Sequence, residues 1–243
     1  MTAEKSTKNF PVFFHLLHAV EKVFSLFSIH AEKAVYASRD FPWTKQLESE
    51  AQNICSELRN ILARREPIPN FQEVSPEQSA ITAGDTWKTF IFYAYGVQAA
   101  RNCVECPQTT AALKKIPGLK TAFFSILAGE SLIPEHRGPY KGLLRCHLGL
   151  LIPPQCGIRI GGNTYEWEQG KTLVFDDTYV HSAWNHSNQD RVVLFIDFVR
   201  PMRFPLSMIN QMILWAIVRS PYGKKYIVRF KKWYQEHGIK SDV

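Results

Sequence analysis

The sequence lacks the features that define several classes of protein. Its five cysteines are odd in number and scattered, unlike the framework of a disulfide-stapled secreted domain. It has no uninterrupted apolar run of about 18 residues, so we expect no conventional transmembrane helix. Its first residues do not follow the order of a signal peptide. We therefore expect a cytoplasmic protein in a reducing compartment.

A recognised nucleic-acid-binding motif is also missing, although the net charge is +7. Five basic residues and no acidic one lie between Lys224 and Lys232. This stretch is either the solvated face of a terminal helix or a surface that attracts an anionic membrane or an acidic substrate. We expect no nucleic-acid partner, and we expect peripheral contact of this basic C-terminal helix with the inner face of a membrane.

Hydrophobic residues make up 45% of the 243 residues, which is enough for a substantial core. A helix is predicted over residues 44–65, because apolar residues recur there at alternating spacings of four and three. They are Leu47, Ala51, Ile54, Leu58 and Ile61. Residues 107–115 predict a short helix, and residues 206–218 and 224–235 predict two C-terminal helices.

The middle of the chain predicts short β-strands with tight connections. They cover residues 87–95, 119–127, 143–151, 173–176 and 192–199. Residues 157–167 predict a hairpin, with Gly161 and Gly162 in its turn. The pattern indicates a mainly β fold with flanking helices and a double-stranded β-helix core of the jelly-roll or cupin type. We expect an N-terminal helical region over 1–70, a catalytic domain over 71–203 and basic amphipathic helices over 204–243.

Residues that bind metals or anions cluster in this β region. His136 and His181 form an HxG…H pattern, in which Gly138 stands where an iron-binding HxD…H motif has its carboxylate. On spacing alone, each histidine is better explained by a hydrogen-bonded polar position at a strand end than by a metal ligand. Asp176 and Asp177 either donate a carboxylate to a metal or cap the turn and orient His181.

Two strands carry further candidates. Arg145 and His147 lie on one face of the strand over residues 143–151. Arg191 opens an apolar strand, where it needs an anionic partner. That partner is either a ligand or Asp197, six residues further along the chain, unless Arg191 occupies a surface or edge position.

Two segments, HRGPYKGLLRCHLGLLIP and WEQGKTLVFDDTYVHSAWNHSNQDRVVLFIDFVRP, resemble the catalytic domain of the aspartyl/asparaginyl β-hydroxylase family. The similarity runs from about residue 87 to residue 201 and is strongest to bacterial members, which include lipid A 2-hydroxylases. It implies a dioxygenase that uses Fe(II), 2-oxoglutarate and O2 to hydroxylate an unactivated carbon. Gly138 matches the animal peptide hydroxylases, whereas the lipid A hydroxylases have aspartate there.

The resemblance also implies roles for individual residues. His136 and His181 would bind iron. Arg191 would grip the distal carboxylate of 2-oxoglutarate with its two-pronged guanidinium, and Ser125 would donate a hydroxyl to that carboxylate. Arg145 and His147 would line the pocket for co-substrate and substrate.

Three functions remain open from the sequence. The substrate is either an Asp/Asn-type peptide side chain or a lipid acyl chain, the latter in a lipid A 2-hydroxylase-like enzyme at a membrane surface. The third alternative is a non-catalytic protein that binds a metal or 2-oxoglutarate on the same fold. Retention of His136, His181 and Arg191 together favours an enzyme.

Overall fold

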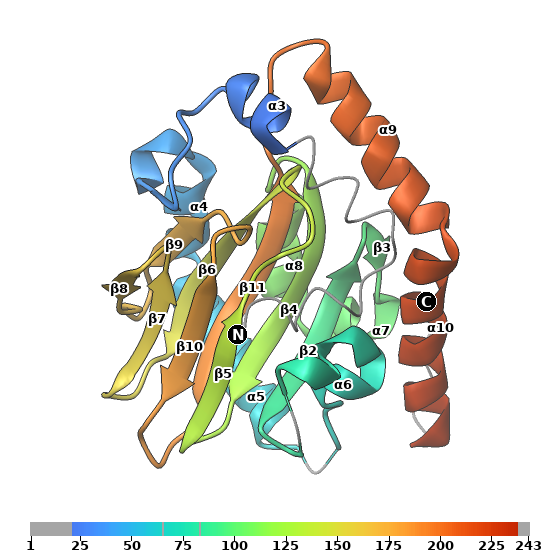
Figure 1. Cartoon of the computed structure of the whole chain (residues 1–243). Helices are drawn as coiled ribbons and strands as arrows, with labels where there is room; N and C mark the ends of the chain where they lie inside the picture. Colours follow the sequence, from blue (N-terminus) through green and yellow to red (C-terminus); the bar gives the residue numbers. More distant parts are fainter. Residues whose placement is uncertain (1–20, 65, 83, 238–243) are drawn as a thin grey trace.

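Two antiparallel β-sheets pack face to face at the centre of the protein (Figure 1). The computed structural model describes residues 21–64, 66–82 and 84–237. In order across the larger sheet, the strands are β1 (Val35–Tyr36), β9 (Thr172–Phe175), β6 (Leu143–Leu151), β11 (Arg191–Val199), β4 (Leu119–Leu127), β2 (Trp87–Ala94) and β3 (Val97–Gln98). The smaller sheet has the order β5 (Ser131–His136), β10 (His181–Asn185), β7 (Cys156–Ile160) and β8 (Asn163–Tyr165).

From β4 onwards the chain passes back and forth between the two sheets. β4, β6, β9 and β11 belong to the larger sheet, whereas β5, β7, β8 and β10 belong to the smaller one. This alternation is the double-stranded β-helix, and it confirms the predicted jelly-roll core.

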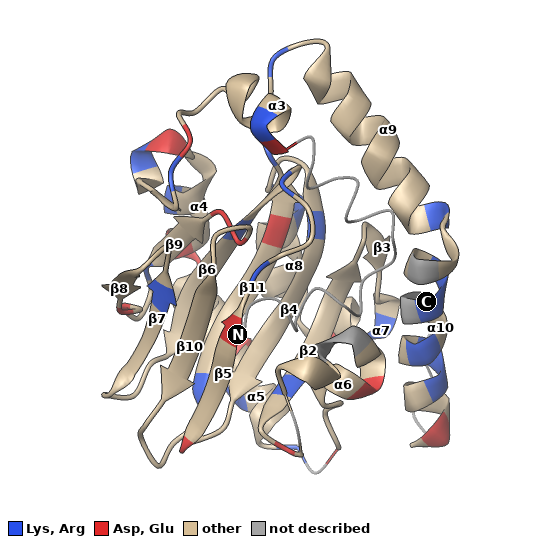
Figure 2. Ribbon diagram, viewed as in Figure 1, with Lys and Arg blue, Asp and Glu red and all other residues tan. Residues whose placement is uncertain are grey.

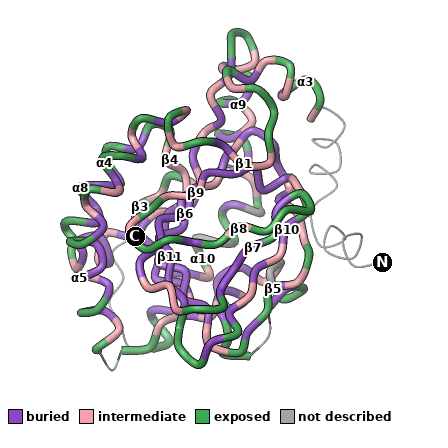
Figure 3. Tube along the Cα trace, turned by 90° about the vertical axis from the view of Figure 1, so that its left-hand side faces the viewer, coloured by how far each residue is buried: buried purple, intermediate pink, exposed green. Residues whose placement is uncertain are grey.

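The larger sheet is apolar on both faces, which explains the nearly continuous apolar sequence of its central strand β11. Val192, Leu194 and Ile196 pack outward under helices, whereas Val193 and Phe195 point inward to the smaller sheet. Figure 3 shows buried positions along the strands and exposed ones on the surrounding helices and loops. The inner face is therefore buried between the two sheets, and the polar residues on this face of the strands are buried with it.

Helices surround the larger sheet: those between residues 43 and 62 and between 100 and 114 pack on its outer face, and the others lie along its β3 edge, at one end or beside its inner face (Figure 1). The helices are α3 (Glu21–Leu26), α4 (Trp43–Ser49), α5 (Ala51–Leu62), α6 (Phe71–Val74), α7 (Ala100–Glu105), α8 (Pro107–Lys114), α9 (Leu206–Arg219) and α10 (Pro221–Glu236), with 3-10 turns at η2 (Ser38–Asp40) and η3 (Pro76–Ala80). Residues 44–65 form two helices instead of the single predicted one, since Glu50 departs from helical geometry with φ −92° and ψ 0°. The predicted apolar stripe, from Leu47 to Ile61, is nevertheless buried as expected.

The C-terminal helix α10 has one buried side and one exposed side. The aromatic side of α10 packs on the protein: Phe230, Trp233 and Tyr234 are buried, and Trp233 donates a hydrogen bond to Glu73. The aromatic side of α10 is thus unavailable to a membrane, whereas its basic side is exposed. Within the described residues, no helix is both long enough and apolar enough to cross a bilayer.

Candidate active site

Two histidines face each other on neighbouring strands of the smaller sheet. His136 ends β5, His181 begins β10, and the two are register partners with ring centroids 4.2 Å apart. Nδ1 of His136 lies 2.8 Å from the Pro134 carbonyl, and Nδ1 of His181 lies 2.9 Å from the Tyr179 carbonyl. An Nδ1–H that donates to a carbonyl leaves the Nε2 lone pair free, as in metal-binding imidazoles.

A β-bulge turns His136 toward His181. Between the pairs His181–His136 and Ala183–Ile133, β10 has one residue but β5 has two. Period 2 alone would place His136 on the face opposite Ile133, and the extra residue reverses this. Pro134 lies in the bulge of this edge strand, a position where a missing N–H is tolerated.

Burial keeps both imidazoles neutral. Desolvation lowers the pKa of His181 to about 4, and the charge of Arg145 acts in the same direction. Desolvation, followed by the nearby His181, holds the pKa of His136 well below its usual value. A neutral pair can bind a cation near pH 7 without first releasing protons.

The space beside Gly138 is filled by the side chain of Asp177. A Cβ atom on Gly138 would lie 2.1 Å from Asp177 Oδ2, and the Gly138 amide donates to the Asp177 carbonyl at 2.7 Å. The Asp177 carboxylate pairs with Arg145 at 2.9 Å. In the described part of the chain, no three His, Cys, Asp or Glu side chains are grouped as a metal site requires. The protein therefore offers two histidines, with Asp177 beside them in an ion pair.

Arg191 is a buried cation whose Nε and Nη1 lack hydrogen-bond partners among the described residues. It is 2% exposed, and its guanidinium lies 4.6 Å from the Trp167 ring centroid. The alternative prediction, an ion pair between Arg191 and Asp197, is wrong, because the Asp197 carboxylate pairs with Arg145 at 2.9 Å. Desolvation lowers the pKa of Arg191 to about 10. Among the described residues, the side chain thus has no carboxylate partner of the kind that a buried arginine requires.

Ser125 and His147 share the inner face of the larger sheet with Arg191. Trp87 Nε1 donates to Ser125 Oγ at 2.9 Å, so the hydroxyl proton of Ser125 is available for another acceptor. Trp167 Nε1 donates to Nδ1 of His147 at 3.3 Å, which places the proton of the neutral ring on Nε2. That Nε2 is buried and has no partner among the described residues. The three predicted anion-binding residues therefore have unused donors on one buried face of the sheet.

Arg145 has a different environment from Arg191. It pairs with Asp177 and Asp197, and its guanidinium lies 4.2 Å from the Phe195 ring centroid. Its charge is thus already matched by two carboxylates. The side chain lines a cavity and is not free to hold a second anion alone.

The cavity beside Arg145 has a volume of about 120 Å³ and extends to α9. Its walls are mainly apolar and include Phe71, Phe123, Leu143, Phe195, Leu214 and Ile217. His136 and His181 do not line it, so it approaches them through Asp177, which packs on Gly138. An apolar group in this cavity would lie next to the residues that adjoin the histidine pair.

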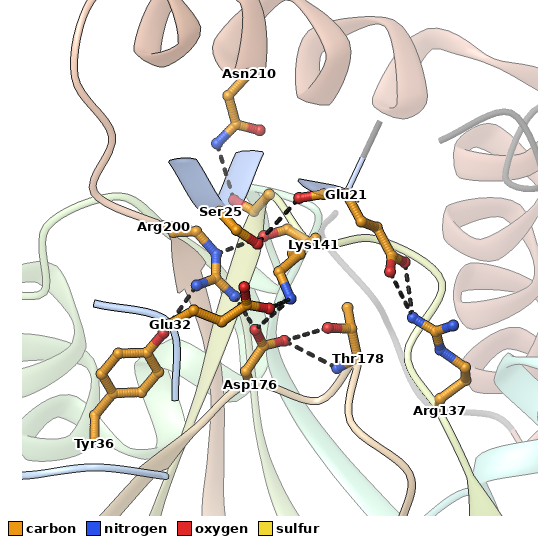
Figure 4. A network of polar contacts seen from close by, with 11 residues as sticks. Glu21, Ser25, Glu32, Tyr36, Arg137, Lys141, Asp176, Thr178, Arg200 and Asn210 are labelled. Atoms are coloured by element: carbon orange, nitrogen blue, oxygen red, sulfur yellow. Dashed lines mark hydrogen bonds and ion pairs between the residues drawn. The ribbon is translucent and has the colours of Figure 1, made fainter. Parts of the chain in front are cut away.

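A buried charge network braces the turn that leads into β10 (Figure 4). The fully buried Asp176 carboxylate accepts a hydrogen bond from Thr178 Oγ1 at 2.6 Å and pairs with Lys141 and Arg200. Lys141 also pairs with Glu32, at 2.5 Å. Asp176 therefore caps the turn, one of the two roles that the sequence left open, and is too fully paired to approach a metal.

The N-terminal segment also reaches the other histidine strand. Arg137, which follows His136, is held by both carboxylate oxygens of Glu21 in α3 at 2.8 and 2.9 Å (Figure 4). Sequence reasoning missed these contacts, because the partners lie more than 100 residues apart. The sequence gives no local signal for these pairs.

Several known proteins are similar to this chain. Residues 48–201 match the model of the aspartyl/asparaginyl beta-hydroxylase family. An ornithine lipid ester-linked acyl 2-hydroxylase of Rhizobium tropici is 41% identical over 202 residues, which are 82% of this chain and 72% of that protein. Aspartate beta-hydroxylase domain-containing protein 2 of Mus musculus is 36% identical over 49% of this chain and 38% of that protein.

Human aspartyl/asparaginyl beta-hydroxylase is 32% identical over 136 residues, 54% of this chain but 18% of that protein. Among solved structures, the cupin domain of an XRE-family transcriptional regulator from Enterobacter cloacae covers 47% of this chain and 97% of its own, with 14% identity and a TM-score of 0.33. The Schizosaccharomyces pombe Cnp3 cupin domain covers 50% and 70%, with 7% identity and a TM-score of 0.33.

Proposed function

This chain belongs to the aspartyl/asparaginyl β-hydroxylase family, and from that membership we propose that it is an Fe(II)- and 2-oxoglutarate-dependent hydroxylase of a lipid acyl chain. Two features together carry the proposal: two neutral histidines that face each other, and a buried arginine that has no carboxylate partner among the described residues. The first arrangement suits a divalent cation, and the second suits a carboxylate.

The residues present fit both absent groups. His136 and His181 would hold Fe(II) through their free Nε2 atoms, with the remaining positions open to co-substrate, O2 and water. Arg191 and Ser125 would hold the distal carboxylate of 2-oxoglutarate, because their donors are unused and share one face. The unpaired Nε2–H of His147 would donate to the same molecule.

Bound Fe(II), 2-oxoglutarate and O2 together supply the oxidation that places a hydroxyl on an unactivated carbon. The protein contributes position and exclusion of water. The two sheets enclose Arg191 and His147, and the buried Asp176 network fixes the turn that carries His181. Arg145 would hold Asp177 away from the histidines by pairing with it.

A lipid acyl chain is the substrate class that we favour. The cavity that leads to Asp177 is lined mainly by apolar side chains, which suit a hydrocarbon better than a charged peptide side chain. The relative from Rhizobium tropici is named for acyl hydroxylation, and its match covers most of both chains. The human relative, named for aspartyl and asparaginyl residues, is matched over less than a fifth of its length.

The direct test is reconstitution with Fe(II), 2-oxoglutarate and O2, with a bacterial lipid extract in one reaction and a peptide pool in another. We expect one lipid species to gain one oxygen and succinate to form, and the double variant His136→Ala/His181→Ala to do neither. A gain of oxygen by peptides alone would refute the lipid assignment. Binding of Fe(II) and 2-oxoglutarate without any product would favour the non-catalytic alternative.

A further inference from the structure

Helix α9 is apolar on both of its faces. Leu214 and Ile217 point inward and are buried, together with Asn210. On the opposite side, Met208, Met212 and Trp215 are 54%, 63% and 59% exposed. A helix that is apolar all round is usually covered on every side, but none of the described residues covers the outer side of α9.

The exposed side of α9 continues beyond the helix. Phe204, just before it, is 74% exposed, and Leu26 in α3 is 77% exposed. These two segments adjoin, because the Arg203 amide donates to the Phe27 carbonyl at 2.8 Å. We call Leu26, Phe204, Met208, Met212 and Trp215 the α9 patch. Clustered apolar exposure of this kind marks an interaction surface, whereas single exposed residues do not.

The charges around the α9 patch are positive. Figure 2 shows α9 without acidic residues and α10 with basic positions along its length. The Arg219 guanidinium lies 4.0 Å from the Trp215 ring centroid, and Lys224 and Lys225 are exposed at the start of α10. The one acidic residue between positions 206 and 236 is Glu236, at the far end of α10. An apolar helix beside a cationic rim complements an anionic lipid surface.

The α9 patch also borders a surface hollow that adjoins the cavity. A surface hollow beside α9 is lined by Met212, Trp215 and Arg219, which belong to the patch and its rim. This hollow shares Leu214 and Val218 with the internal cavity that ends at Arg145 and Asp177. Residues on two sides of one helix therefore connect the outer surface to the candidate site.

We propose that α9 is a membrane-docking helix, which lies in the surface of an anionic bilayer with Met208, Met212 and Trp215 among the lipid and Arg219, Lys224 and Lys225 on the headgroups. Docking in this orientation places this hollow, which adjoins the cavity, against the bilayer, and an acyl chain would enter from there without crossing water. Docking itself depends only on the surface of α9 and α10. Delivery of an acyl chain rests on the proposed function.

Sedimentation of the full chain with phosphatidylglycerol-containing vesicles tests the proposal, without Fe(II) or 2-oxoglutarate. We expect binding at low salt, and a loss of about 100-fold in Met208→Ser/Met212→Ser/Trp215→Ser, because each side chain no longer gains from burial. The matched control is Leu132→Ser, which removes an apolar side chain that is 63% exposed on β5 and should bind as the parent does.

The cationic rim has its own readout. Lys224→Gln/Lys225→Gln should lose roughly 30-fold in affinity for anionic vesicles and little for neutral ones. The difference should vanish near 1 M salt, where the screening length is about 3 Å. Circular dichroism should show unchanged folding, since all six substituted positions are exposed.

Two outcomes would overturn the proposal. One is that the parent does not sediment with anionic vesicles at low salt. The other is that the triple α9 variant binds these vesicles as well as the parent does. If the parent instead forms a dimer that the triple variant abolishes, and does not bind vesicles, the α9 patch is a contact between two copies. Vesicle binding without oxygen transfer would refute the enzyme and leave the docking surface standing.

Discussion

Two buried arginines have opposite surroundings, so replacing each by methionine should change stability in opposite directions. Arg200 donates to Asp176, to the Lys141 carbonyl and to the Tyr36 hydroxyl. Arg191 is equally buried, but its Nε and Nη1 have no partner among the described residues. Burial lowers the pKa of Arg191 to about 10, which corresponds to a cost of about 3 kcal/mol for the charged form.

We expect Arg191→Met to raise the free energy of unfolding of the ligand-free protein by about 1–3 kcal/mol, since an unpaired buried charge is removed. The same substitution should weaken 2-oxoglutarate binding by roughly 30-fold to 4,000-fold, the equivalent of about 2–5 kcal/mol for a desolvated charge pair. Arg200→Met should instead lower the free energy of unfolding by about 3–5 kcal/mol, because it leaves Asp176 without one of its cations.

Urea denaturation of the metal-free protein gives the first quantity, and calorimetric titration of 2-oxoglutarate into the Fe(II)-loaded protein without oxygen gives the second. Arg191→Lys keeps the charge but loses the two-pronged guanidinium, so it should weaken the binding of 2-oxoglutarate while the affinity for Fe(II) stays nearly unchanged. The reasoning is refuted if Arg191→Met destabilises the protein and binds 2-oxoglutarate as tightly as the parent. Arg191 would then be a structural residue.

Three further perturbations probe the histidine pair. Either His136→Ala or His181→Ala should weaken Fe(II) binding more than about 100-fold in calorimetry, beyond the loss typical of outer-shell partners, and parental affinity would disprove the ligand assignment. Gly138→Asp should destabilise the protein by about 1–3 kcal/mol in thermal denaturation, because the new Cβ would collide with the Asp177 carboxylate. Adding Asp177→Gly should restore stability, and no recovery would contradict the packing argument. The pKa of His181 is lowered to about 4, so below pH 6.5 the unfolded chain takes up a proton that the folded protein does not. The metal-free protein should therefore lose roughly 3 kcal/mol of stability as the pH falls from 6.5 to 4, and a His181→Asn variant with the same slope would exclude His181 as the cause.

The strands of the larger sheet were readable from the sequence because their signals are local. Residues 119–127 and 143–151 were predicted as strands and form β4 and β6 with the same bounds. The hairpin at β7 and β8 was predicted from its glycines, and Gly161 and Gly162 adopt φ of +55° and +88°. Strong alternation and turn chemistry decide such elements without reference to the rest of the chain.

The strands that carry the two histidines were missed for physical reasons. β5 contains Pro134, which argues against a strand unless the strand is at an edge or bulged, and here it is both. β10 has the short sequence HSAWN, whose polar residues hide its alternation. Only the pairing of β5 with β10 shows that His136 and His181 point to the same side.

The sequence by itself determined the jelly-roll core, the family and the identity of the candidate ligands, because local alternation, turn residues and ordered motifs are written along the chain. Tertiary structure decided how these residues are paired. In the folded protein Asp197 pairs with Arg145, so Arg191 has no carboxylate partner among the described residues, and Asp177 packs against Gly138. It also turned the aromatic side of α10 inward and left the apolar side of α9 exposed. Helical periodicity says which residues share a face, but the partner of that face is set by contacts between segments far apart in the sequence.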